Sequence, residues 1–384
     1  MTAAALTGAA PAPPVGVAPR PGAPHLNRIG TAHPPHDVHD AFRAYARTLL
    51  PDERMRTLFD RMADRAGIRQ RWSFLEPGRL DQGEVDAGGF YRPGAFPGTA
   101  ERMRAFEPQA LALARSAVRA LDRGGDLGAQ LARVTHLVVA TCTGFTAPGL
   151  DLQLTEALGL RADVARTMVG FMGCAAAVPA LRVADAVLRA QPEARVLVVN
   201  VELSSLHLRE TADLEDILSF LLFGDGASAA LLSCEPQGLA LLDFQAQVIP
   251  HSQGFITWHI GDQGFEMHLS GKVPARIAST LRAERERAGP GGLLRGVAPG
   301  EIELWAVHAG GRSVLDAVQS GLDLAPDALD DSRAVLDAHG NMSSATVMFV
   351  LQRFMAKGRA GQQGLALAFG PGMVAESLRF EVGP

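Results

Sequence analysis

The chain has 384 residues, of which 47% are hydrophobic and 20% charged, and its formal net charge is −5 at pH 7. This is an ordinary globular composition, with enough residues for two core-bearing units or one large duplicated unit. The acidic balance and the lack of a long basic run argue against nucleic acid as the main partner, and no uninterrupted apolar stretch reaches the length that an integral membrane helix needs.

The ends and the cysteines of the chain indicate where it works. Residues 1–25 are rich in Ala and Pro and lack a basic segment followed by a long apolar one, so we expect a disordered extension and no secretory signal. The three cysteines, at 142, 174 and 234, are far apart and have no metal-ligand spacing. Such an odd, sparse count fits a reducing compartment, so we expect a cytoplasmic protein without a metal site.

In the first part of the chain, apolar periodicity predicts alternating helices and strands. Helices are predicted over 39–50, 52–67 (with Pro51 at its start), 97–123, 155–160 and 214–222, and strands over 136–141, 167–171, 194–200 and 228–233. A helix also follows Cys174. Because strands and helices alternate, the pattern favours parallel α/β layers.

From about residue 238 a similar pattern begins again. Strands are predicted over 239–248, 303–307, 364–369 and 374–380, and helices over 273–288, 313–319 and from the loop at 340–344 to residue 357. We therefore predict two similar halves, 26–237 and 238–384. Ligands in such sheets bind outside the carboxyl ends of the strands, so a shared crevice between the halves is the expected site.

Cys174 follows a predicted strand and a glycine turn and precedes a helix. A thiol at a helix N-terminus feels the positive end of the helix dipole, which stabilises the thiolate. Cys174 is therefore a candidate nucleophile. The alternative is a small buried residue that packs a strand–helix joint, since free cysteines are often buried.

His308 ends a predicted strand and Asn341 follows a glycine. Alone, each is a weak signal, because core histidines and turn asparagines are common. Together with Cys174 they form a candidate Cys–His–Asn set, and their separation in sequence is no objection.

Five motifs extend this set. They are GFMGCAAA at 170–177, FGDGASA at 223–229, HAGG at 308–311, GNMSSA at 340–345 and FGPG at 369–372. In this order they resemble the type III polyketide synthases, the chalcone synthase-like branch of the thiolase-fold condensing enzymes, and Cys142 is typical of bacterial members. Ketoacyl synthase III enzymes also carry Cys–His–Asn, but usually with an HQAN-like motif where this chain has His308 to Gly311.

The resemblance implies a thiolase-like α/β fold: two similar halves with layered helices and mixed sheets, the active site at their interface, and a homodimer. Cys174 matches the nucleophile that holds the acyl chain, His308 the base, and Asn341 its partner in binding the thioester carbonyl. A thiolate–imidazolium pair would lower the pKa of the cysteine. The substrates would be acyl-CoA and malonyl-CoA, with no metal or redox cofactor.

The resemblance also assigns a substrate cavity. Phe223 matches one gatekeeper between the CoA tunnel and the cavity. The alternative interpretation is a core phenylalanine before a glycine turn, and both can hold. Met267 stands where a second phenylalanine is common, and Trp258 where a small glycine is common, which narrows the cavity. The remaining cavity positions are Cys142, Thr143, Ser204, His207 and Ser343.

Basic residues on the predicted helix 52–67 are candidates for binding CoA phosphates. Arg61 and Arg65 align with basic residues that the family uses in this way, whereas Leu58 occupies a third such position and Arg56 is the candidate replacement. The alternative is a solvated charged helix face.

The expected activity is iterative decarboxylative condensation of malonyl-CoA onto an acyl-CoA starter, followed by cyclisation. The small residues Ala175 to Ala177 and the non-aromatic Met267 favour a fatty starter and alkylresorcinol or alkylpyrone products, whereas Trp258 favours malonyl-CoA alone and 1,3,6,8-tetrahydroxynaphthalene. A non-catalytic acyl-CoA-binding protein of the same fold is the alternative of another class. A hydrolase is disfavoured because the chain has no G-x-S-x-G elbow.

Overall fold

The structure is a computed structural model that describes residues 22–287, 289 and 291–383. Most of the expected N-terminal extension, residues 1–21, lies outside the described residues. The last predicted residue of the extension, His25, instead begins strand β1 and pairs with Ser233 on one side and Ala240 on the other.

The elements up to residue 233 are mostly those expected from the sequence. They are β1 (His25–Ala32), β2 (His36–Asp37), α1 (His39–Leu49), α2 (Glu53–Asp64), β3 (Trp72–Ser73), α3 (Thr99–Arg119), α4 (Leu127–Ala132), β4 (His136–Thr141), α5 (Leu150–Ala157), β5 (Ala165–Gly170), α6 (Ala177–Ala190), β6 (Val196–Leu203), α7 (Leu214–Phe220) and β7 (Asp225–Ser233).

The remaining elements repeat the alternation. They are β8 (Leu239–Val248), β9 (Ile256–Gly261), β10 (Gly264–Leu269), α8 (Val273–Glu286), β11 (Leu304–Val307), α9 (Arg312–Leu322), α10 (Asp330–His339), α11 (Thr346–Lys357), β12 (Gln363–Gly370) and β13 (Val374–Val382).

Nine strands form one mixed sheet in the order β11-β12-β13-β8-β1-β7-β6-β4-β5. The pairs β4–β5, β4–β6 and β11–β12 are parallel, and the central pairs are antiparallel. Since β1 joins β7 to β8, the strands of both predicted halves are continuous in one sheet. The predicted α/β class with mixed strands and layered helices is confirmed, while the division at 237/238 stays a prediction.

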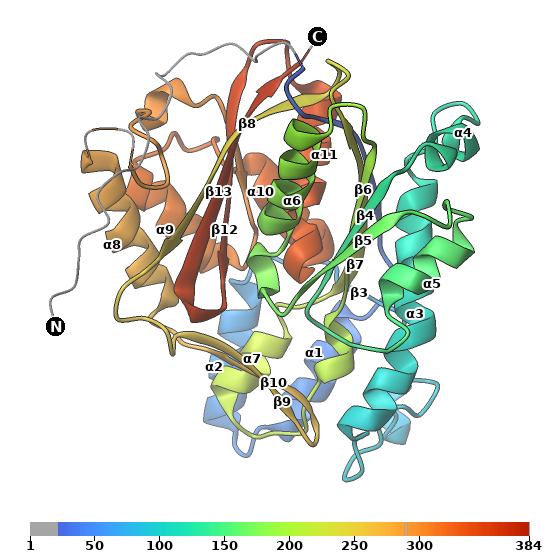
Figure 1. Cartoon of the computed structure of the whole chain (residues 1–384). Helices are drawn as coiled ribbons and strands as arrows, with labels where there is room; N and C mark the ends of the chain where they lie inside the picture. The colour runs from blue at the N-terminus through green and yellow to red at the C-terminus, as the bar shows by residue number, and fades with distance from the viewer. Residues whose placement is uncertain (1–21, 288, 290, 384) are drawn as a thin grey trace, which may run out of the picture.

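The helices are arranged in layers around the strands (Figure 1). Helices α6, α10 and α11 lie between the two wings of the sheet, α8 and α9 cover the outer side of one wing, and α3 and α5 cover the outer side of the other. The hairpin β9–β10 lies with α1, α2 and α7 at one end of the molecule.

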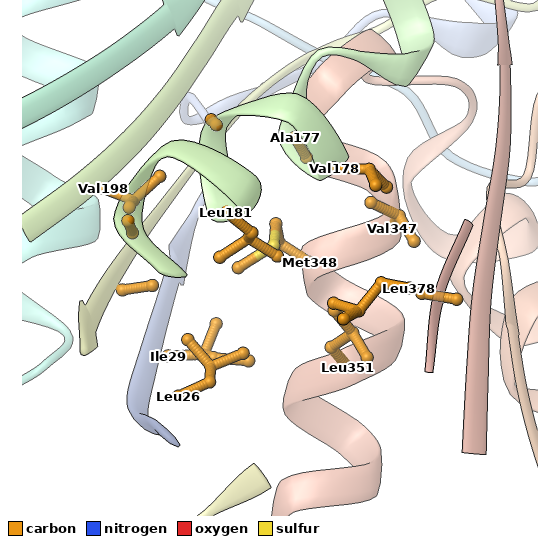
Figure 2. Close-up of a cluster of buried hydrophobic side chains, with 14 of the residues drawn as sticks. Leu26, Ile29, Ala177, Val178, Leu181, Val198, Val347, Met348, Leu351 and Leu378 are labelled. Carbon is orange, nitrogen blue, oxygen red and sulfur yellow. The ribbon is translucent and has the colours of Figure 1, made fainter. Parts of the chain in front are cut away.

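The central core packs α6 and α11 against both wings (Figure 2). Leu181 of α6 meets Met348 of α11, with Val198 of β6 on one side and Leu378 of β13 on the other. The side of α6 that faces the two wings is apolar and carries small side chains such as Ala180 and Ala184. This core fixes the N-terminal ends of both helices, and residues of the site lie just before them.

Four expectations about the elements need correction. Helix α2 begins at Glu53, because the Asp52 side chain accepts a hydrogen bond from Met55 N and caps it, so Pro51 lies outside. The short helix expected at 155–160 is α5, which begins after Gly149. Strand β5 is exposed along most of its length because it is an edge strand. Strand β1, helices α4 and α10 and the hairpin β9–β10 were not predicted.

Candidate active site

Cys174 lies in a single 3₁₀ turn, Gly173–Ala175, between strand β5 and helix α6. This turn needs glycine: Gly173 has φ +56°, and a Cβ there would lie 2.5 Å from Pro371 Cδ. The FGPG motif therefore packs directly on the turn that presents the thiol. The predicted order of strand, turn, cysteine and helix is what the structure has.

His308 and Asn341 reach the same place from the other part of the chain. His308 follows β11 and its backbone N–H donates to Leu367 O at 2.8 Å, which extends the parallel pairing with β12 by one residue. Asn341 follows α10, and its Oδ1 and Nδ2 each lie 3.9 Å from Cys174 Sγ. All three residues line one cavity.

The side chain of Asn341 is fixed by two backbone contacts. Its Oδ1 accepts from Ser343 N at 2.8 Å, and its Nδ2 donates to Gly310 O at 3.2 Å. An amide nitrogen carries two N–H groups, so one remains for a ligand in the cavity. Asn341 is thus a positioned donor beside the thiol.

Burial controls the charges of this set. It raises the pKa of the Cys174 thiol to about 11, which bonds from Ser343 and Asn341 offset only in part, and it lowers the pKa of His308 to about 3. Burial alone therefore favours a thiol and a neutral imidazole. The expected thiolate–imidazolium pair stays a prediction: among the residues that the structure describes, neither ring nitrogen of His308 has a hydrogen-bond partner, so no contact between charges offsets their desolvation.

Most of the residues predicted for the cavity line it. The predicted residues that line it are Cys142, Thr143, Ser204, Phe223, Trp258, Met267 and Ser343. Further lining residues, which the sequence reasoning missed, are mostly apolar: Ile256, Leu269, Val273, Ile277, Val314 and Phe369.

His207 does not line this cavity but supports its wall from behind, in a smaller adjoining cavity. Its Nε2 donates to Thr143 O at 2.7 Å and its Nδ1 accepts from Phe265 N at 3.0 Å, so burial keeps it neutral and lowers its pKa to about 3. Trp258 Nε1 donates to Cys142 O at 2.8 Å. These bonds hold Trp258 and His207 as a fixed wall.

Glu202 is a further site residue that the sequence reasoning missed. Its carboxylate is fully buried beneath the cavity and accepts from Cys142 N at 3.0 Å, Thr143 Oγ1 at 2.9 Å and Ser344 Oγ at 2.5 Å. The Cys142 thiol contacts both Glu202 and Ser343. The signal was present, since a lone acidic residue in the apolar strand β6 needs buried donors.

A surface groove adjoins the cavity and shares Leu269, Val273 and Val314 with it. Arg65 lines this groove, together with Arg312, which the sequence reasoning missed. Arg61 is exposed on α2 outside the groove lining, and Arg56 donates from Nε and Nη2 to Leu50 O, so its guanidinium is occupied. Of the three predicted arginines, only Arg65 lines the groove.

Two family models match the chain in succession. The model for the N-terminal domain of chalcone and stilbene synthases matches residues 19–236, and the model for their C-terminal domain matches residues 241–382. The chain belongs to the chalcone and stilbene synthase family. The predicted identity as a type III polyketide synthase, an acyl-transferring condensing enzyme, is confirmed; the bacterial subtype stays a prediction.

A curated relative and solved structures agree with this family. Polyketide synthase 37 of Dictyostelium discoideum is 30% identical over 340 residues, which cover 84% of this chain and 11% of that protein, so the chain spans about a tenth of the relative's length. PKS-I of the brown alga Ectocarpus siliculosus is 29% identical, with a TM-score of 0.79 and coverage of 94% of this chain and 98% of that one.

The fold is also shared with the C-terminal type III polyketide synthase domain of Steely1 from Dictyostelium. That domain is 23% identical, with a TM-score of 0.83 and coverage of 94% of this chain and 100% of that one. The predicted thiolase-like fold is confirmed. Within the described part of the chain, every helix is too short or too polar to span a membrane.

Proposed function

We propose that this chain is an iterative, CoA-dependent polyketide synthase that extends an acyl starter with malonyl-CoA and cyclises the product. The observation that supports this most directly is that Cys174, His308 and Asn341 open into one largely apolar cavity. A binding protein would need the cavity but not a nucleophile, a base and a carbonyl donor at one end of it.

Loading begins when Cys174 Sγ attacks the carbonyl carbon of the starter thioester. The new bond joins Sγ to the acyl carbon, and the bond to the CoA sulfur breaks. His308 takes the thiol proton and returns it to the departing CoA thiolate. A neutral imidazole is the form that accepts a proton.

Extension begins with loss of CO₂ from malonyl-CoA. The bond to the carboxylate breaks, and its electron pair forms an enolate whose oxygen needs donors where the charge develops. The free N–H of Asn341 and an N–H of His308 are these donors. The enolate carbon then attacks the Cys174 thioester, which releases the thiolate for the next cycle. These steps use CoA thioesters as substrates and require no metal or redox cofactor.

For the starter, we propose an aliphatic acyl-CoA and an alkylresorcinol or alkylpyrone product. The support is the apolar lining contributed by β9, β10, α8 and α9, which includes Ile256, Leu269 and Ile277. Such a lining favours an alkyl chain by about 0.8 kcal/mol for each methylene that it buries.

A second candidate has its own support. Trp258 is held by its bond to Cys142 O and stands edge-on to His207, with ring centroids 5.6 Å apart. This wall shortens the cavity on the side of Cys142 and Thr143. A short cavity favours malonyl-CoA as the only substrate and 1,3,6,8-tetrahydroxynaphthalene as the product.

The deciding experiment is mass spectrometry of products after incubation with malonyl-CoA, alone and with a series of acyl-CoA starters, with Cys174→Ala as the control. Products whose mass increases with the length of the starter support the proposed alkylresorcinol or alkylpyrone synthesis. A naphthol from malonyl-CoA alone establishes the second candidate. The absence of any Cys174-dependent product would contradict the proposed function.

A further inference from the structure

Arg71 is a buried cation just before strand β3, outside the substrate cavity. It is 1% exposed and lines two small cavities, one of which also touches Phe223. Its guanidinium donates from Nε to His39 Nδ1 at 3.1 Å and from Nη1 to Phe220 O at 3.1 Å and Phe223 O at 2.9 Å. These three acceptors are neutral, because burial lowers the pKa of His39 to about 4.

Burying such a cation costs the folded state free energy of desolvation. Burial lowers the pKa of Arg71 to about 10, since attraction to Asp37 and Asp225 offsets only part of the desolvation, and the side chain stays charged at neutral pH. Its Nη2 has no hydrogen-bond partner. A buried charge without a contacting carboxylate is usually less stable than an apolar side chain of the same size. The presence of Arg71 is therefore better explained by the contacts that it fixes than by a contribution to the stability of the fold.

Those contacts lead to Asn341. The segment that Arg71 holds pairs with the Asn341 backbone on both sides of Phe223: Asn341 N donates to Leu222 O at 2.8 Å, and Gly224 N donates to Asn341 O at 3.0 Å. On the other side, a Cβ on Gly340 would lie 2.8 Å from Arg71 Cγ, so the stem of the arginine packs against the residue before Asn341.

We infer that Arg71 is a positioning residue for Asn341: it fixes the 220–223 segment and the Gly340 turn so that the Asn341 amide faces the reacting carbonyl. This rests on the proposed function, in which Asn341 is a donor to the malonyl oxygen. Arg71 touches neither the thiol nor the cavity. Its loss therefore acts through Asn341, and its effect on the alkylation of Cys174 should be no larger than that of removing the Asn341 amide.

The test compares Arg71→Lys with Arg102→Lys. Arg102 is a matched control because it is 0% exposed and also holds backbone carbonyls, those of Pro97, Leu206 and Leu208, but none next to Asn341. Both variants should lower the melting temperature. At a temperature where both are folded, only Arg71→Lys should lower kcat for malonyl-CoA decarboxylation, by at least about tenfold, because small displacements of a reacting group have effects of this size.

A double variant separates positioning from general damage. If Arg71 acts through Asn341, then Arg71→Lys should cause no further loss of decarboxylation in an Asn341→Ala background. Iodoacetamide labelling of Cys174 should change no more in Arg71→Lys than it does in Asn341→Ala. Equal losses in Arg71→Lys and Arg102→Lys, or a multiplicative loss in the double variant, would overturn the inference.

A milder variant covers the case in which Arg71→Lys does not fold. His39→Leu removes only the acceptor of Arg71 Nε and leaves the bonds to Phe220 and Phe223 in place. It should lower malonyl-CoA decarboxylation selectively but by a smaller factor than Arg71→Lys does. Unchanged decarboxylation would contradict the positioning role of Arg71. If the wild-type chain does not decarboxylate malonyl-CoA, the proposed function is refuted. A negative result in the comparison of the Arg71 and Arg102 variants refutes only the role of Arg71.

Discussion

At the scale of single residues, the charges of Cys174 and His308 in the free enzyme decide how the thiol is activated. Cys174 and His308 are both desolvated, and burial favours the uncharged form of each. The helix that follows Cys174 favours the thiolate only modestly, because the dipole of a helix end contributes about 1 kcal/mol. In the free enzyme, desolvation is the larger effect, so activation of the thiol belongs to the step in which His308 accepts its proton.

This reasoning predicts the pH dependence of Cys174 alkylation in the free enzyme. A raised thiol pKa means that the reactive thiolate is scarce at neutral pH and increases as the pH rises toward the folded pKa of about 11. The labelling rate with iodoacetamide should therefore rise about tenfold per pH unit through the alkaline range, without a plateau near neutrality. Acyl-CoA should protect the thiol, and Cys174→Ala gives the background from Cys142 and Cys234.

A labelling rate that already levels off near neutral pH would contradict the uncharged forms of Cys174 and His308. It would show that Cys174 and His308 form the ion pair in the free enzyme, as the resemblance alone suggests. The same profile in His308→Gln locates the cause, because a plateau that depends on His308 identifies that residue as the partner of the thiolate.

The residues of the set could be found from the sequence because each stands at a recognisable place: Cys174 after a strand and a glycine turn, His308 at a strand end, and Asn341 after a glycine. Glu202 could not be assigned in the same way. Its strand position was visible, but its role depends on donors from Cys142 and Ser344, which only the fold brings to it.

At the scale of elements, the hairpin β9–β10 is the part of the cavity that sequence reasoning described least well. Its strands pair antiparallel, with Met267 opposite Trp258, so both residues enter the wall together. Alternation of Ile256, Trp258 and Ile260 before the turn was a strand signal that went unused. The positions of Trp258 and Met267 were nevertheless predicted, because they came from motif resemblance and not from the hairpin.

Trp258→Gly should lengthen the starters that the enzyme accepts. The indole occupies space next to Cys142 and contributes one wall of the cavity. Where that space is opened, each additional methylene of a starter can gain about 0.8 kcal/mol, or about fourfold in kcat/KM, until the new cavity is full. The measurement is kcat/KM for a homologous series of acyl-CoA starters.

Ile260→Gly is the matched control for that change, because Ile260 lies two residues further along β9, is 61% exposed and does not line the cavity. Its starter profile should match the wild type. A Trp258→Gly profile that also stays unchanged would show that the indole does not limit the acyl chain.

The two sides of helix α2 differ in what they contact. Its acidic residues Asp60 and Asp64 form ion pairs with Arg43 of α1. Arg65, just past its end, lies at the groove that leads to the cavity. We propose that this side of α2 receives the phosphates of CoA.

Arg65→Gln should raise KM for an acyl-CoA without changing KM for the corresponding N-acetylcysteamine thioester, which lacks the nucleotide phosphates. An exposed ion pair contributes at most about 1 kcal/mol, so the increase should be up to about fivefold. Arg54→Gln, on the same helix but away from the groove, is the control. An equal rise in KM for both kinds of thioester would contradict a phosphate contact.

At the scale of the whole molecule, the order of elements and the fold class followed from the sequence, but the place of each strand in the sheet did not. The strand before Cys174 was expected to be buried, because its residues are apolar. It is instead the edge strand β5, and Met168 is 38% exposed. Local periodicity cannot distinguish an edge from a centre, because that depends on which strands pair.

This exposed edge supports the proposed homodimer. Phe145 and Met172, on the turns that follow β4 and β5, are 39% and 38% exposed. An edge strand with unpaired backbone groups and exposed apolar side chains is a surface that another chain covers. A two-fold dimer uses the same patch on both chains, so each substitution is counted twice.

The whole chain should therefore sediment at twice the chain mass of 40.6 kDa, and Met168→Asp should convert it to the monomer. Withdrawing two methionine side chains from a two-fold interface removes about 4 kcal/mol, so the dimer dissociation constant should rise about a thousandfold. Val248→Asp, at a 58% exposed position at the end of β8, is the control and should leave the dimer intact. Analytical ultracentrifugation over a range of concentrations measures both. A monomeric wild type, or equal dissociation of the two variants, would mean that β5 is not the interface, and the apolar edge would then need another partner.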